Sequence, residues 1–413
     1  MGIIKEASIN RELAWQRSKE LKERIMPYLK ARKKILSGLN LEKEYAARKE
    51  KILNILDGTE KNWNDWHWQI RNRIDNSNML RKIIDLTDQE IKEIEKVSSR
   101  YRWAISPYYA SLIAPDDPND PIRLQAVPSI QEYLDTQGKD DPMAEMSTSP
   151  APLITRRYGD RLIINITNMC AMFCRHCQRR RNIGEVDLHS DRGDIAEALS
   201  YIQENPEIRD VLITGGDPFT LPDEALEYLL VELEKIPHVE IKRFGTRTPV
   251  TLPQRITEEL CQMLSRHLPL YINTQFNHPR EVTRESQKAC LRLARAGVGL
   301  GNQAVLLKGI NNDPHIMKKL NHELLKCMVR PYYIFHAKLV RGTSHFIPRV
   351  EEGIEIMEQL RGYTSGLAVP TYIINAPDGH GKTPILPQYL VSIDKKHVTF
   401  RNWEGKFFKY PNP

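Results

Sequence analysis

Between residues 161 and 377 the sequence alternates short apolar runs with segments of helical periodicity. The apolar runs are RLIINIT (161–167), DVLITGG (210–216), VEIKRFGT (239–246), YINTQF (271–276), VGLGNQAVLL (298–307), RPYYIFHA (330–337) and TYIINAP (371–377). Helical segments, such as 196–203, 224–233 and 280–296, lie between them. Apolar strands separated by helices indicate a parallel sheet. At least six such units predict an α/β protein with a partial (β/α)6-type barrel, whose functional residues follow the carboxyl ends of the strands.

The rest of the chain divides by composition into three further parts. Residues 1–114 are rich in charge and in good helix formers, and they predict an N-terminal helical region. Residues 115–158 contain PDDPNDP and MSTSPAPL and predict a proline-rich, ordered linker. The barrel is expected over residues 159–388, and residues 389–413 are left as a C-terminal tail.

Charge and hydropathy narrow the class of protein. The net charge of +7 comes from mixed runs such as KERIMPYLKARKK, which are typical of solvated helix faces. A basic nucleic-acid-binding protein with a metal-stabilised fold is the non-enzyme alternative, and it would bind DNA or RNA in a salt-dependent way. No run approaches the ~20 apolar residues of a membrane span, and the N-terminus lacks a signal core. We therefore expect a cytoplasmic protein with no membrane or nucleic-acid partner.

Three of the six cysteines lie together in NMCAMFCRHCQRRRNIG (168–184), directly after the first expected strand. A fully protein-bound [4Fe-4S] cluster takes four cysteines, so three leave one iron open for another ligand. The spacing therefore predicts a reactive cluster on Cys170, Cys174 and Cys177. A structural zinc site with a distant fourth ligand such as His176 is the alternative.

Two glycine-containing stretches follow other strands. TGGD (214–217) follows the second strand, and a glycine pair there would let the backbone approach a ligand closely. Together with the cysteines it resembles the radical S-adenosylmethionine enzymes, in which S-adenosylmethionine chelates the open iron. NAPDGHGKTPILP places Lys382 after a turn at the end of the last strand. A partly desolvated lysine can condense with the aldehyde of pyridoxal phosphate.

Several stretches in the same order resemble the lysine 2,3-aminomutase family. They are WNDWHWQIRNRI, SPYYASLIAPDDPNDPIRLQAVPS, CAMFCRHCQRRR, RTPVTLPQRIT, FNHP, GNQAVLLKGIN, PYYIF and NAPDGHGKTP. Members of that family combine a [4Fe-4S] cluster, S-adenosylmethionine and pyridoxal phosphate to move an amino group between C2 and C3 of an amino acid. The resemblance also implies a flavodoxin- or ferredoxin-type electron donor and a homo-oligomer.

The resemblance assigns roles residue by residue. It implies that Cys170, Cys174 and Cys177 hold the cluster and that Lys382 anchors pyridoxal phosphate. It places Arg179 on the substrate α-carboxylate, where a planar guanidinium matches the carboxylate. The remaining cofactor-binding residues that it implies are Arg157 and Arg161 near the phosphate, together with Gly215, Gly216, Asp217 and Gln303.

Two positions depart from the lysine-specific members, which hold the distant ammonium of lysine with two aspartates. Lys338 and Asn375 stand there instead, a change of three charge units. Each like-charge contact at ~4 Å costs roughly 4 kcal/mol at an effective dielectric near 20, so lysine should be rejected and a terminal carboxylate accepted. Arg341, three residues later, would add positive potential. The pattern resembles the glutamate-specific branch, which interconverts L-glutamate and β-glutamate.

The same comparison with the lysine enzyme leaves two alternative substrates open and predicts that one metal site is missing. If Lys338 points away from the pocket, the substrate is lysine or another amino acid. The lysine enzyme also has a C-terminal cysteine-rich zinc motif, whereas this chain has no cysteine after Cys327. We therefore predict no structural zinc.

Overall fold

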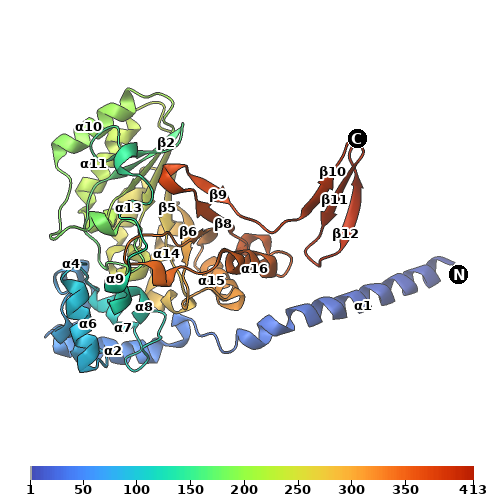
Figure 1. Cartoon of the computed structure of the whole chain (residues 1–413), viewed down its shortest axis with the longest axis horizontal. Helices are drawn as coiled ribbons and strands as arrows, with labels where there is room; N and C mark the ends of the chain where they lie inside the picture. The colour runs from blue at the N-terminus through green and yellow to red at the C-terminus, as the bar shows by residue number, and fades with distance from the viewer. Residues whose placement is uncertain (1) are drawn as a thin grey trace.

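A curled sheet of seven parallel strands forms the centre of the molecule (Figure 1). The computed structural model describes residues 2–413, with side chains from residue 10 onward, so the helical prediction for Met1 lies outside it. The parallel strands follow sequence order and are β2 (Arg161–Asn165), β3 (Asp210–Thr214), β4 (Ile241–Gly245), β5 (Leu270–Thr274), β6 (Gly299–Leu306), β7 (Arg330–His336) and β8 (Thr371–Asn375). All seven apolar runs coincide with these strands, although β5 begins one residue before its run, and this confirms the predicted α/β barrel class.

Short antiparallel strands close both edges of this sheet. β1 (Ile154–Arg156) pairs with β2, and β9 (Lys382–Pro384) pairs with β8. Helices cover the outer face between the strands: α10 (Arg192–Gln203), α11 (Asp223–Glu234), α13 (Glu258–Ser265), α14 (Arg284–Arg295), α15 (Pro314–Lys326) and α16 (Val350–Leu360). In α11 the buried residues recur at helical spacing and pack in the core, namely Leu226, Leu229, Leu230 and Leu233.

The strands are not apolar on both faces along their whole length. In β2, Leu162 and Ile164 are buried in the core, whereas Arg161 and Ile163 line an internal cavity. Arg243 on β4 and Gln303 on β6 line the same cavity. The inner face of the sheet is therefore partly polar, because it encloses a cavity rather than a packed core.

A helical region precedes the barrel. It comprises α1 (Gly2–Ala31), α2 (Glu42–Ile55), α3 (Glu60–Asn64), α4 (Trp66–Arg71), α5 (Ser77–Ile83), α6 (Asp88–Ser98) and α7 (Pro107–Ser111). The helices α2 to α7 pack beside the barrel, and Trp63 and Trp68 are buried in the main core. Residues 115–158 cross to the barrel through α8 (Arg123–Ala126) and α9 (Ile130–Leu134).

Both ends of the chain extend from the same side of the body (Figure 1). The segment that the sequence left as a tail folds into a small antiparallel sheet of β10 (Leu390–Ile393), β11 (His397–Arg401) and β12 (Phe407–Pro411). Arg17 of α1 forms an ion pair with Glu404 at 2.6 Å between β11 and β12. Within residues 2–413, no helix combines the length and apolarity needed to cross a membrane.

Candidate active site

The carboxyl ends of the parallel strands open into one cavity of about 310 Å³. Every strand from β2 to β8 contributes a residue to its wall, either from its last positions or from the loop that follows. The cavity brings together all of the predicted site residues: Arg157, Arg161, Cys170, Cys174, Cys177, Arg179, Gly215, Gly216, Asp217, Gln303, Lys338, Asn375 and Lys382. The topology explains this convergence, since the carboxyl ends of parallel strands meet at one edge of the sheet.

The three cysteines occupy the loop after β2. All are free and partly buried. Burial raises the pKa of the Cys170 thiol well above its ordinary value, and the nearby Asp217, Cys177 and Cys174 raise it further. Thiolate charges at these positions would repel one another, and a bound iron cluster would relieve this repulsion. The donor set fits a cluster with one open iron.

The loop is held in place by the segments that precede the barrel. The backbone nitrogen of Phe173 donates to the carbonyl of Ala104 at 3.0 Å, and that of Arg175 donates to the carbonyl of Gln125 at 2.9 Å. The Arg175 side chain forms a buried ion pair with Glu132. These contacts fix the loop without using a cysteine side chain.

The alternative of a single zinc ion is less well supported by this geometry. Among residues 10–413, no three His, Cys, Asp or Glu side chains surround a position for one metal ion. His176 points instead toward two amides, with its Nε2 atom 2.9 Å from Nε2 of Gln275 and 3.3 Å from Nδ2 of Asn277. Three ligands that each bind a different iron of a cluster need not surround one point.

The glycine pair after β3 has a different steric reason from the one that the sequence suggested. A Cβ atom at Gly215 would collide with the carbonyl of Thr167, and one at Gly216 with the carbonyl of Met169. Gly215 also has a φ of +131°. The pair thus allows the end of β3 to pack directly against the start of the cysteine loop.

Asp217 links two strand ends. Its Oδ1 accepts from the Thr246 hydroxyl at 2.6 Å, and its Oδ2 accepts from the backbone nitrogen of Arg247 at 2.7 Å. Burial raises its pKa. Although Asp217 borders the cavity, both carboxylate oxygens already bind protein donors.

Lys382 reaches the opposite part of the cavity because β9 turns back onto β8. The turn contains Gly379 and Gly381 at positive φ, and it sets Lys382 opposite Asn375 in the β8–β9 register. Burial lowers the pKa of Lys382 to about 8, and the cations Arg243, Arg161 and Arg157 contribute to the shift. A lysine of this kind is more nucleophilic at neutral pH than an exposed one.

Lys338 lies in the same part of the cavity, two residues after β7. Its Nζ and the Nζ of Lys382 are both 5.7 Å from the ring centre of Phe335. Burial lowers the pKa of Lys338 to about 7, as do the neighbouring Arg157 and Arg179. No carboxylate of residues 10–413 lies within 4.0 Å of either lysine nitrogen. The Asn375 amide nitrogen is likewise buried with no partner.

A buried glutamate that the sequence analysis did not single out binds three arginines, one of which is Arg181 at 3.3 Å. Glu145 accepts from Nε of Arg179 at 3.1 and 3.2 Å and from Nη2 of Arg157 at 3.1 Å. Its segment shows no periodicity that could have marked it. Arg243, whose Nε donates to Asp210 at 2.7 Å, was also missed because it lies inside an apparently apolar run.

Arg341 does not contribute to the cavity. Its Nε lies 2.9 Å from Oδ1 of Asp140, and its side chain is 38% exposed. The positive charge of Arg341 therefore lies at the surface, where it is paired with Asp140 and exposed to solvent.

Comparisons with known proteins agree with this arrangement. The profile of the radical SAM superfamily matches residues 164–320, and the profile described as Lysine-2,3-aminomutase matches residues 357–413. Glutamate 2,3-aminomutase of Clostridioides difficile is 58% identical over 96% of this chain and 94% of its own length. L-lysine 2,3-aminomutases of Clostridium subterminale and Acetoanaerobium sticklandii are 50% and 48% identical, each over 86% of both chains.

Proposed function

The chain belongs to the lysine 2,3-aminomutase family of radical SAM enzymes, and from this premise we propose that it interconverts L-glutamate and β-glutamate by moving the amino group between C2 and C3. The observation that carries the choice of substrate is Lys338, a half-buried cation with no carboxylate within 4.0 Å among residues 10–413, together with the unpartnered amide nitrogen of Asn375 in the same cavity wall. A second carboxylate of the substrate would satisfy both groups.

The charge balance of the cavity supports an anionic substrate. Six cations lie in one part of its wall: Arg157, Arg161, Arg179, Arg243, Lys338 and Lys382. Among residues 10–413, two carboxylates pair with them, Glu145 and Asp210. The phosphate of pyridoxal phosphate and the two carboxylates of glutamate would compensate this excess, whereas the second ammonium of lysine would add to it.

Each cation has a distinct proposed role. Arg179 binds the α-carboxylate through its two Nη atoms, because Glu145 already orients it through Nε. Lys338 and Asn375 hold the γ-carboxylate, so the substrate is fixed at both ends and C3 is oriented for hydrogen transfer. Lys382 anchors pyridoxal phosphate, with Arg157 and Arg161 at its phosphate and Gln303 nearby.

The cofactors supply the chemistry that these residues cannot. When held at the three cysteines, a cluster with S-adenosylmethionine would supply the radical, and pyridoxal phosphate held by Lys382 would supply a π-bond for the migrating nitrogen. Radical SAM enzymes need a reductant, and we propose a flavodoxin- or ferredoxin-type protein. We also propose a cytoplasmic location, because an iron-sulfur cluster and free cysteines require a reducing compartment. A homo-oligomer is proposed from the family resemblance alone.

The test is a direct comparison of two substrates. The full chain is reconstituted anaerobically with iron, sulfide and pyridoxal phosphate, and it receives S-adenosylmethionine and dithionite. L-Glutamate and L-lysine are then incubated separately while proton NMR follows the products. We expect β-glutamate alone. Formation of β-lysine alone would agree with membership of the family but would refute the roles proposed for Lys338 and Asn375.

A further inference from the structure

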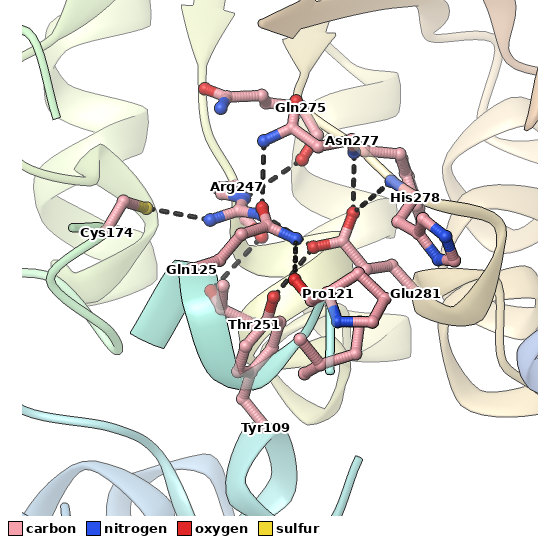
Figure 2. Close-up of polar contacts among 12 residues, drawn as sticks. Tyr109, Pro121, Gln125, Cys174, Arg247, Thr251, Gln275, Asn277, His278 and Glu281 are labelled. Carbon is pink, nitrogen blue, oxygen red and sulfur yellow. Dashed lines mark hydrogen bonds and ion pairs between the residues drawn. The ribbon is translucent and has the colours of Figure 1, made fainter. Parts of the chain in front are cut away.

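A buried arginine contacts one of the three cysteine sulfurs (Figure 2). Arg247 follows β4 and donates from Nη1 to Sγ of Cys174 at 2.8 Å. Among residues 10–413 it is the one side chain that donates to any of the three sulfurs. The backbone nitrogen of Arg179 makes a longer contact of 3.4 Å with Sγ of Cys177. One sulfur of the three therefore receives a charged hydrogen bond.

The guanidinium of Arg247 is fixed on all three nitrogens. Nε donates to the carbonyl of Gln275 at 3.0 Å, and Nη2 donates to Oε1 of Glu281 and to Oε1 of Gln125, each at 2.7 Å. The side chain of Arg247 is 9% exposed. Because a planar guanidinium held at Nε and Nη2 cannot rotate, Nη1 is directed at the sulfur.

Glu281 is itself held by several donors in the same network (Figure 2). Its Oε2 accepts from the backbone nitrogens of Asn277 at 2.6 Å and His278 at 3.0 Å, and the Tyr109 hydroxyl donates to Oε1 at 2.7 Å. The carboxylate is fully buried. A buried ion pair needs such additional hydrogen bonds to offset the loss of water from both charges.

A hydrogen bond to a ligand sulfur acts on the redox equilibrium of an iron-sulfur cluster. Reduction adds negative charge to the cluster and its ligand sulfurs, so a cationic donor binds the reduced state more strongly than the oxidised state. Hydrogen bonds to the sulfurs are among the factors that set cluster potentials. Burial of Arg247 strengthens the effect, since the donor is shielded from water.

We propose that Arg247 raises the reduction potential of the cluster through its hydrogen bond to Cys174. Glu281 and Gln125 are positioning residues that hold the guanidinium for this contact. The inference rests on the cluster that the radical SAM family implies and not on the identity of the amino acid substrate. It brings in a residue from before the barrel, because Gln125 of α8 accepts from the Arg247 guanidinium.

The test is an EPR-monitored redox titration of the anaerobically reconstituted full chain without any amino acid. The variants are Arg247→Lys, which keeps a charge but loses the fork geometry, and the double variant Arg247→Gln with Glu281→Gln. The double variant removes both charges together, so no carboxylate is left buried alone. Tyr109→Phe is the matched control, because it removes a hydrogen bond to Glu281 without touching the sulfur. Iron and sulfide content and circular dichroism are measured for each protein.

We expect both Arg247 variants to shift the equilibrium about tenfold toward the oxidised cluster, about 59 mV for one electron, and Tyr109→Phe to leave it unchanged. An unchanged potential at full cluster content would overturn the proposal, as would an equal shift in Tyr109→Phe. Loss of the cluster from folded Arg247 variants would also overturn it and would assign Arg247 to cluster retention. Because no amino acid is present, none of these outcomes depends on the proposed glutamate activity.

Discussion

Arg247 and the two lysines of the cavity wall, Lys338 and Lys382, differ in how their charges are matched. Arg247 forms an ion pair with Glu281, and every nitrogen of its guanidinium has an acceptor. Lys338 and Lys382 have no carboxylate within 4.0 Å among residues 10–413. Both lysines also lie near arginines, and these neighbours lower their pKa values. The charge of Arg247 is balanced without a small anionic ligand, whereas the charges of Lys338 and Lys382 are not.

Charges that are balanced within the fold hold the protein together, whereas unbalanced charges are available to bind a ligand. Matched charges such as those of Arg247 and Glu281 offset their desolvation within the fold. Cations without a counter-charge destabilise the free protein, and a bound anion removes this destabilisation. The lysines are therefore the better candidates for contact with cofactor and substrate, and the predictions below test this contrast.

The largest effect is expected at Lys382. Lys382→Ala should lower the formation of β-glutamate roughly 1000-fold or more, because the amine proposed to anchor pyridoxal phosphate is lost. Proton NMR measures the product, and the visible absorbance of bound pyridoxal phosphate should disappear. Lys395→Ala, at an exposed lysine, is the control and should retain both. Full activity in Lys382→Ala would show that this unmatched lysine does not hold the cofactor.

The next effect concerns substrate choice. Changing Lys338 and Asn375 together to aspartate should lower glutamate turnover roughly 100- to 1000-fold, which corresponds to about 3–4 kcal/mol and so to about one like-charge contact at ~4 Å. Competition between the two substrates, followed by NMR, measures the preference. Arg341→Asp changes a charge on the same loop outside the cavity and should leave the preference unchanged. An unchanged preference in the double variant would place Lys338 outside the substrate site.

Much of this site could be predicted because strand ends converge. The apolar runs fixed the strands, and the cysteines, Lys338 and Lys382 all follow strands that end at one edge. The sequence order alone therefore placed them together. Spacing also marked the three cysteines as one ligand set.

Other contacts depend on chain paths that local patterns do not reveal. Glu145 lies in a proline-rich segment, and it reaches Arg179 only because that segment crosses the cavity wall. Arg247 is 73 residues from Cys174 in sequence, so its contact follows from the curl of the sheet. The strands β10 to β12 were missed because they are mostly exposed and lack a continuous apolar run.

Stability should distinguish the two groups of charges directly. Glu281→Gln leaves Arg247 buried without its counter-charge and should lower the free energy of unfolding by about 3–5 kcal/mol. Lys338→Met removes an unmatched cation and should raise it by on the order of 1 kcal/mol. Thermal unfolding of both variants without amino acid, compared with the parent chain, measures the contrast. Equal destabilisation by the two changes would mean that the charge of Lys338 is matched within the fold.

The smallest effect is a shift in a pH profile. The pKa of Lys382 is lowered to about 8, so its neutral, nucleophilic form should appear as the pH rises through about 8. The rate at which cofactor-free protein takes up pyridoxal phosphate should rise between about pH 7 and pH 9 and then level off, whereas an ordinary lysine, with a pKa near 10.4, would still be titrating. Absorbance measures this rate.

Arg243→Gln removes a neighbouring cation that helps to lower this pKa, and it leaves Asp210 unpaired nearby. Both changes favour the charged lysine, so the midpoint of the profile should move to higher pH and uptake at pH 8 should fall a few-fold. Arg209→Gln, at an exposed ion pair with Glu240, is the matched control and should not move the midpoint. If the parent profile rises steadily to pH 10, or if Arg243→Gln leaves it in place, the unmatched cations do not act on Lys382. The difference between Lys382 and Arg247 would then be supported only by the positions of their charged neighbours.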